Sequence, residues 1–159
     1  MLDSEAFKTL VKNAPLVSID LCLIYQNKLL LGKRNNEPLK GEWFTPGGRI
    51  HKNETWAQAL TRIVKSELNI AHVDVGAYSL MGIWDHFYNN SAFDPNISTH
   101  YVNLPHYAEL HTKPEIISDE QHVAFAWLDL LMVSKHQNYH PYMRKYASWL
   151  LNEKRKKND

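Results

Sequence analysis

The pattern of apolar and polar positions predicts a chain that mixes helices with strands. Residues 3–12 favour a short helix that ends at the sequence NAP, because a proline disfavours helical geometry in the residue before it. The run PLVSIDLCLIYQNKLLLGKR alternates weakly and then becomes continuously apolar, and its polar QN predicts two paired strands joined by a tight turn. Short strands are expected at EWFT and RI, around a sharp bend marked by Gly47 and Gly48.

The second half of the chain predicts more strands and a closing helix. Strand-like segments occur at VDVGAYSLMGIW, THYVNLPHYAEL and VAFAWLDL, with turn-rich stretches between them. A helix follows Pro141, and no internal repeat, low-complexity segment or linker interrupts the chain. We therefore expect one α/β domain over residues 1–159.

A helix is also expected from Asn53, its predicted N-cap, to about Asn69. A rotation of about 100° per residue predicts a buried stripe that contains Glu67 among the apolar residues Trp56, Leu60, Ile63 and Val64. A buried carboxylate needs a cation, a proton or hydrogen-bond donors. On the helix alone, the simpler interpretation is that Glu67 reaches water at the helix end.

The preceding Gly47–Gly48 turn favours a metal site instead. Glycines let the backbone approach an ion, and their carbonyl oxygens are hard ligands. A divalent cation fits between such a turn and an inward-pointing carboxylate. The sequence therefore favours a site at which the turn and the helix both supply oxygen ligands.

Composition and charge exclude several function classes. The chain has 159 residues, 44% of them hydrophobic, and its single cysteine, Cys22, lies in the apolar run LCLIY. A lone buried cysteine indicates a reducing compartment, and we expect the cytoplasm. The N-terminal sequence MLDSEAFK carries two acids, and no run reaches the roughly 18 apolar residues of a membrane span. A net charge of +1 provides no broad basic face, so we expect neither nucleic acid nor a membrane as partner.

The spacing of charged residues after the glycine pair resembles a known signature. Gly48, Glu54, Arg62, Glu67 and Ile70 stand in the register of the Nudix box, over the 23 positions from 48 to 70. This box is the loop-helix-loop motif of hydrolases that act on nucleoside diphosphates linked to another group. The resemblance implies an α/β/α sandwich with a mixed central sheet. Glu54 and Arg62 are expected to pair and brace the loop against the helix.

The box differs from the usual pattern at Ile63, Ser66 and Asn69, where the family has two acids and a glycine. That difference resembles the GDP-mannose mannosyl hydrolase branch. The likeness extends to LLLGKRNNEPLKGEWFTPGGR, MGIWDHFY, STHYV and ISDEQHVAFAWL, and covers most of residues 14–130. It implies hydrolysis of GDP-mannose or GDP-glucose to GDP and free hexose, by attack of water at the anomeric carbon with inversion.

The resemblance also implies site residues. One Mg²⁺ per active site, or alternatively Mn²⁺, would be held by the Gly47 carbonyl, Glu67 and the side-chain oxygen of Gln121. His122 would be the general base, because an imidazole accepts a proton near neutral pH. An isolated QH pair, without the family register, would indicate only a loop histidine.

Further residues match family positions around the substrate. Arg34 and Arg49 would bind the diphosphate, although either side chain could form a surface ion pair instead. Asp20 interrupts an apolar strand, so it either faces solvent at a sheet edge or lies in a pocket. In a pocket, the resemblance implies that it would position the base or the substrate. His86 and Tyr101 would contact the leaving group or the sugar, and they also suit a partly buried sheet face. A homodimer is implied as well.

Two other functions remain open from the sequence. A pyrophosphohydrolase would attack phosphorus, against which Ile63 and Ser66 argue by removing two acids. A nucleotide-sugar-binding module without catalysis would have no use for a poised base such as His122. We therefore expect an enzyme.

Overall fold

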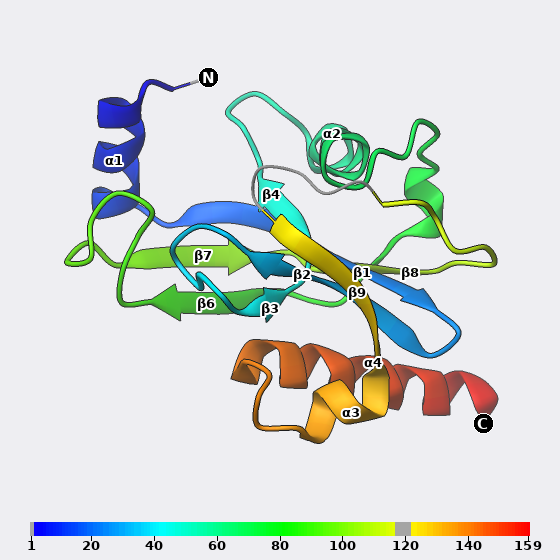
Figure 1. The fold of residues 1–159 in the computed structure, drawn as a ribbon. Coiled ribbons are helices and arrows are strands. Elements are labelled where there is room, and N and C mark those ends of the chain that lie inside the picture. Colours follow the sequence, from blue (N-terminus) through cyan, green and yellow to red (C-terminus); the bar gives the residue numbers. More distant parts are fainter. Residues whose placement is uncertain (1, 117–121) are drawn as a thin grey trace.

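The computed structural model describes residues 2–116 and 122–159 (Figure 1). Its first hairpin joins β1 (Leu16–Tyr25) to β2 (Lys28–Arg34) through Gln26 and Asn27. Both turn residues have positive φ, 49° and 62°, which matches the twist of a two-residue hairpin. The predicted pair of strands is confirmed.

The other strands extend a sheet centred on β1 and β2. They are β3 (Trp43–Phe44), β4 (Gly47–Arg49), β5 (Ser79–Leu80), β6 (Trp84–Tyr88), β7 (Thr99–Asn103), β8 (His106–Glu109) and β9 (His122–Asp129). β1 pairs antiparallel with β2 and β4, and parallel with β7 and then β8. β9 and β3 pair antiparallel with β2, while β6 lies beside β7. The sheet is mixed, as expected.

Helices cover both faces of this sheet (Figure 1). α2 (Trp56–Leu68) lies on one face, and α3 (Leu130–Lys135) and α4 (Pro141–Asn158) lie on the other. α1 (Ser4–Asn13) stands at one end, near β7, and a short 3₁₀ helix spans Val75–Ala77. This arrangement confirms the α/β class. Within the described ranges no helix is both long and apolar enough to cross a membrane.

Alternation along β1 divides the core between the two faces. Ile19, Leu21 and Leu23 pack in the cluster that contains the buried residues of α2. Cys22 and Ile24 pack in the opposite cluster with residues of α3 and α4. Cys22 is fully buried, as predicted, and burial raises the pKa of its thiol.

The start of α2 differs from the prediction. The N-cap is Thr55 rather than Asn53, because Thr55 and Gln58 form a reciprocal capping box. Asn53 instead has a φ of 68°, in the turn before the helix. Trp56 was expected in the buried stripe and is 50% exposed, because this first helical residue lies where the chain enters α2. Glu67 is 9% exposed and points inward, as predicted.

One expected strand was wrong in detail, and one helix was not expected. VDVGAYSLMGIW is mostly not a strand: it contains the 3₁₀ helix, the short β5 and only the first residue of β6. Gly82 separates β5 from β6 with a φ of 100°, which favours glycine. α3, which Asp129 caps by accepting a hydrogen bond from the Met132 amide at 3.1 Å, was not predicted.

Candidate active site

A cavity of about 610 Å³ lies where the β4 turn and α2 approach β1 and the β6–β7 pair. Its described lining includes seven of the nine residues that the sequence placed at the site: Asp20, Arg34, Gly47, Arg49, Glu67, His86 and Tyr101. These residues come from separate elements of the fold. The structure thus brings them around one space large enough for a small molecule.

The other two predicted residues are Gln121 and His122. Gln121 lies outside the described residues. The described part of His122 is its backbone, which begins β9 and pairs with Arg34 of β2 after a register shift. The start of β9 therefore lies beside the strand that supplies Arg34 to the cavity.

The Gly47–Gly48 turn is held close to β1. Gly47 pairs with Asp20, and a Cβ at Gly47 would lie 2.5 Å from the carbonyl oxygen of Ile19. The same Cβ would lie 2.7 Å from Oδ1 of Asp20, so a larger residue would displace the cavity wall. Gly48 packs against Ile63, and a Cβ there would lie 3.2 Å from Cγ1 of Ile63.

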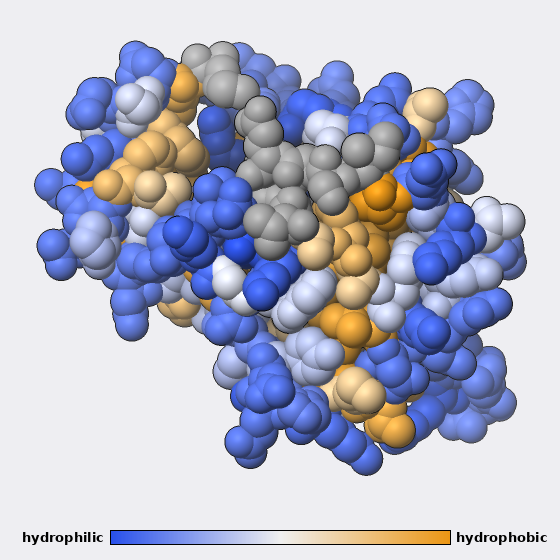
Figure 2. All heavy atoms as spheres, viewed as in Figure 1, coloured by the Kyte–Doolittle hydropathy of each residue, from blue (hydrophilic) through white to orange (hydrophobic). Residues whose placement is uncertain are grey.

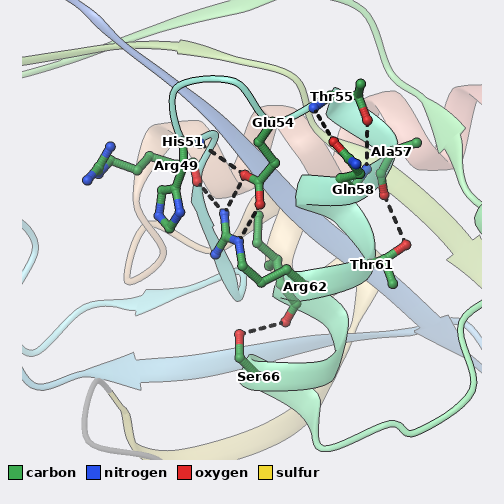
Figure 3. A network of polar contacts seen from close by, with 10 residues as sticks. Arg49, His51, Glu54, Thr55, Ala57, Gln58, Thr61, Arg62 and Ser66 are labelled. Carbon is green, nitrogen blue, oxygen red and sulfur yellow. Dashed lines mark hydrogen bonds and ion pairs between the residues drawn. The ribbon is translucent and has the colours of Figure 1, made fainter. Parts of the chain in front are cut away.

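An ion pair braces the loop that follows this turn (Figure 3). Nε of Arg62 donates to Oε2 of Glu54 at 2.7 Å, and Nη2 of Arg62 donates to the Arg49 carbonyl oxygen at 2.8 Å. The His51 amide donates to Glu54 at 3.0 Å. The Arg62 hydrogen bond, despite partial burial, lowers the pKa of Glu54 to about 2. The predicted pair is confirmed, and it fixes the backbone beside Arg49.

Helix α2 directs Glu67 into the cavity. Ile63 and Ser66 occupy the two positions at which the Nudix box usually has acids. Ile63 is buried against the turn, and the Ser66 hydroxyl donates to the Ile63 carbonyl at 3.4 Å. Neither side chain supplies a negative charge. Glu67 is therefore the acid that α2 contributes to the cavity lining.

The donor chemistry of this region fits a hard divalent cation. Gly47 and Glu67 line the same cavity, and they offer a carbonyl and a carboxylate oxygen. The described residues contain no group of three or more His, Cys, Asp or Glu that could hold a metal ion. A ligand set with one carboxylate and neutral oxygens is consistent with both observations.

Asp20 lies in a buried polar network at the cavity wall. Its Oδ2 accepts from Nδ2 of Asn103 at 2.5 Å and from the Tyr146 hydroxyl at 2.7 Å. Burial raises the pKa of Asp20 to about 6, although these donors and the charge of Arg34 oppose the rise. Asp20 is therefore mainly a carboxylate near neutral pH.

His86 belongs to the same network. Nδ2 of Asn103 lies 3.2 Å from its Nδ1, and the ring stacks on Tyr142 with centroids 3.9 Å apart. Burial, with a smaller contribution from His140, lowers the pKa of His86 to about 4. The imidazole is therefore neutral near pH 7. Because Nδ1 of His86 faces the side-chain amide donor of Asn103, we assign the single ring hydrogen of the neutral imidazole to Nε2.

Arg34 and Arg49 supply positive charge to the cavity. Nε of Arg34 donates to the Pro38 carbonyl at 2.9 Å, and the Arg49 guanidinium lies over the ring of Phe7. Among the described residues, neither guanidinium is within ion-pair distance of an acid. Burial raises the pKa of Tyr101, so its phenol stays protonated and can donate a hydrogen bond.

Sequence reasoning missed three residues of this site: Phe7, Asn103 and Tyr146. Asn103 lies two residues after Tyr101 on the same strand, so the period of two was a usable signal. Tyr146 lies on α4, the helix expected after Pro141. Its contact with Asp20 joins residues 126 positions apart, which no local pattern reveals.

Comparison with known sequences gives three findings. The NUDIX domain model matches residues 15–150. The low-salt glycan biosynthesis protein Agl8 of Haloferax volcanii is 35% identical over 149 residues, 94% of this chain and 90% of that protein. The ADP-ribose pyrophosphatase of Methanocaldococcus jannaschii is 39% identical over 56 residues, which are 35% of this chain and 33% of that protein.

Solved structures show the same arrangement of elements. The MutT NUDIX hydrolase of Burkholderia pseudomallei superposes with a TM-score of 0.67 at 24% identity, covering 86% of this chain and 98% of that one. The MutT protein of Methanosarcina mazei gives 0.68 at 16% identity, with coverages of 89% and 97%. At these identities the likeness establishes a shared fold.

Proposed function

The chain belongs to the Nudix family of hydrolases, and from that premise we propose that it hydrolyses a GDP-hexose, GDP-mannose or GDP-glucose. Water attacks the anomeric carbon, the bond from that carbon to the diphosphate oxygen breaks, and GDP leaves as the free hexose forms with inversion. The name of the Agl8 relative supports a substrate class used in glycan synthesis, since nucleotide sugars donate the sugars of glycans.

The observation that carries the proposal is the distribution of charge in the cavity. Helix α2 supplies Glu67, whereas Ile63 is packed under the turn and Ser66 is neutral. Attack at phosphorus in this family relies on the acids that these two residues replace. Attack at carbon needs fewer acids, because its leaving group is a diphosphate that stabilises negative charge by itself.

Arg34 and Arg49 are the residues we assign to the diphosphate. Both line the cavity, and neither has an acid within ion-pair distance among the described residues. A guanidinium can donate two parallel hydrogen bonds to phosphate oxygens. In this proposal they bind the substrate and stabilise the charge that develops on departing GDP.

The proton from the attacking water goes to His122, which we propose as the general base. Asp20, fixed through Oδ2, presents its other oxygen toward Gly47, and we assign it a positioning role. His86 and Tyr101 are neutral near pH 7 and suit contacts to sugar hydroxyls or the leaving group.

We propose Gly47, Glu67 and Gln121 as the residues that hold one Mg²⁺ or Mn²⁺ ion. When bound, this ion would supply Lewis-acid stabilisation of the diphosphate charge. Glu67 is fixed for that purpose by its place on α2, between the buried Val64 and Leu68. We also propose that the enzyme is a homodimer and that it acts in the cytoplasm.

A second candidate function is pyrophosphohydrolysis. The similarity to the ADP-ribose pyrophosphatase favours it, although that alignment covers only 35% of this chain. Such an enzyme would attack phosphorus and release GMP and a hexose 1-phosphate from a GDP-hexose.

Product identification separates the two functions. The purified chain is incubated with GDP-mannose, GDP-glucose and ADP-ribose in the presence of Mg²⁺, and the products are identified by ³¹P and ¹H NMR. GDP with free hexose, formed in the opposite anomer, is the expected result. GMP with hexose 1-phosphate, or turnover of ADP-ribose alone, would refute the proposed reaction.

A further inference from the structure

Helix α1 lies outside the part of the chain that matches the family. The match begins at residue 15, whereas α1 ends at Asn13. Even so, Leu2 and Phe7 from this segment line the same cavity as Asp20 and Glu67. The N-terminal helix therefore reaches the proposed substrate site from outside the residues that the family model matches.

The contact that joins α1 to the site is between Phe7 and Arg49. The guanidinium carbon of Arg49 lies 4.6 Å from the centroid of the Phe7 ring, within the range of a cation–π contact. The Phe7 ring is itself fixed by an edge contact with Phe93, with centroids 5.2 Å apart. Apolar side chains gather over α1 in Figure 2, consistent with a helix held by such packing.

The backbone and the side chain of Arg49 are fixed by different elements. Arg62 binds the Arg49 carbonyl oxygen at 2.8 Å, which holds the backbone against α2. No acid among the described residues fixes the guanidinium, so the face of Phe7 is the contact that orients it. A cation–π contact uses the charge of the guanidinium and none of its N–H hydrogen bonds, which leaves these donors available to phosphate oxygens.

We propose that Phe7 is a positioning residue that holds the Arg49 guanidinium ready for a diphosphate, so that α1 forms part of the substrate site. This inference rests on the proposed function for the assignment of Arg49 to the diphosphate. It goes further because it places a determinant of substrate affinity in a helix that the family match does not include.

The test uses Phe7→Leu, which removes the aromatic face, and Phe7→Tyr, which retains it. Phe87→Leu is a matched control, because Phe87 is 61% exposed and is not among the cavity-lining residues. Dissociation constants are measured by calorimetry with Mg²⁺ and either GDP or ADP-ribose, and the ligand that wild type binds more tightly is used for the variants. Tighter binding of ADP-ribose would count against the proposed function without affecting this comparison, because both ligands carry a diphosphate.

Phe7→Leu is expected to weaken ligand binding by about 3- to 30-fold. With the substrate of the wild-type enzyme, kcat/KM should fall by at least a similar factor, because Arg49 is proposed both to bind the diphosphate and to stabilise departing GDP. Phe7→Tyr and Phe87→Leu should bind like wild type. In an Arg49→Met background, Phe7→Leu should cause no further loss, because the contact is already absent.

Wild-type affinity in Phe7→Leu would overturn the inference. An equal loss from Phe7→Leu with and without Arg49 would also overturn it, since Phe7 would then act independently of the guanidinium. A lower melting temperature with unchanged ligand affinity and unchanged kcat/KM would assign Phe7 a purely structural role.

Discussion

At the scale of single residues, the site is defined by how each charge is compensated. Asp20 is buried but receives two donors on one oxygen, so it remains mainly ionised near pH 7. Glu54 is paired with Arg62, whereas no acid among the described residues lies within ion-pair distance of Arg34 or Arg49, although Asp20 is close enough for the charge of Arg34 to lower its pKa. Both guanidinium groups therefore leave donors for an anionic ligand.

Glu67→Gln tests the proposed metal ligand. The substitution retains the shape of the side chain but replaces an anionic oxygen with a neutral one, which weakens a hard-cation site. We expect the Mg²⁺ concentration that gives half-maximal activity to rise at least about tenfold. Glu109→Gln is the control, because Glu109 lies on β8 and pairs with Lys154 at 3.1 Å. An unchanged Mg²⁺ requirement in Glu67→Gln would contradict the assignment.

Tyr146→Phe tests the hydrogen bond that the Tyr146 hydroxyl donates to Asp20. The variant removes a donor at 2.7 Å from a buried carboxylate, and a hydrogen bond to a charged group contributes about 1.5–3 kcal/mol. We expect the free energy of unfolding, measured in urea, to fall by about that amount. In Tyr146→Phe combined with Asp20→Asn the further cost of losing the hydroxyl should be smaller. Equal costs in both backgrounds would show that the hydroxyl does not act through Asp20.

At the scale of elements, the loop between β4 and α2 is shaped by polar contacts at both ends. Glu54 and Arg62 join the loop to the middle of the helix, and Thr55 with Gln58 caps the helix start. Asn69 ends the helix in the left-handed conformation with a φ of 53°. These contacts set the position of Glu67 relative to the Gly47–Gly48 turn.

The Glu54–Arg62 pair predicts an acid-dependent loss of stability. In the folded state the pKa of Glu54 is about 2, below the ordinary value of 4.5, so the folded protein binds a proton at this carboxylate less readily than the unfolded chain does. The stabilisation is present above pH 4.5 and is lost as pH falls toward 2. Urea unfolding across this window should show a weaker decline in Glu54→Gln than in wild type. Parallel curves would contradict a contribution from this pair.

Thr55→Ala tests the N-cap of α2, which is Thr55 and not the expected Asn53. Removing the hydroxyl that accepts from the Gln58 amide at 3.1 Å should lower the free energy of unfolding by about 1 kcal/mol. Asn53→Ala should not reproduce a capping loss, because Asn53 lies in the turn before the helix; any cost there would come from its positive φ. Asn53→Gly, which accepts that φ, distinguishes the two causes. A loss in Asn53→Gly as large as in Thr55→Ala would contradict the assignment of the cap.

At the scale of the whole molecule, the sequence predicted what depends on local pattern and motif spacing. The β1–β2 hairpin, α1, α4 and the inward position of Glu67 follow from periodicity and turn residues. The gathering of Asp20, Arg34 and His86 in one cavity was inferred from family resemblance, and the structure places them together.

The remaining features depend on contacts between distant segments. The contact between Tyr146 and Asp20 and that between Phe7 and Arg49 join elements far apart in the chain, so no local period marks them. Tyr146 and Phe7 also read as ordinary apolar positions of amphipathic helices. Tertiary packing alone gives them a polar or cationic partner.

In the proposed reaction water attacks carbon rather than phosphorus, and isotope labelling distinguishes these two sites of attack. GDP-mannose is hydrolysed by the purified chain in ¹⁸O-labelled water with Mg²⁺, and each product is analysed by mass spectrometry. We expect the label to enter the free mannose and GDP to carry none. Label in GMP, in a hexose phosphate or in GDP would contradict this expectation.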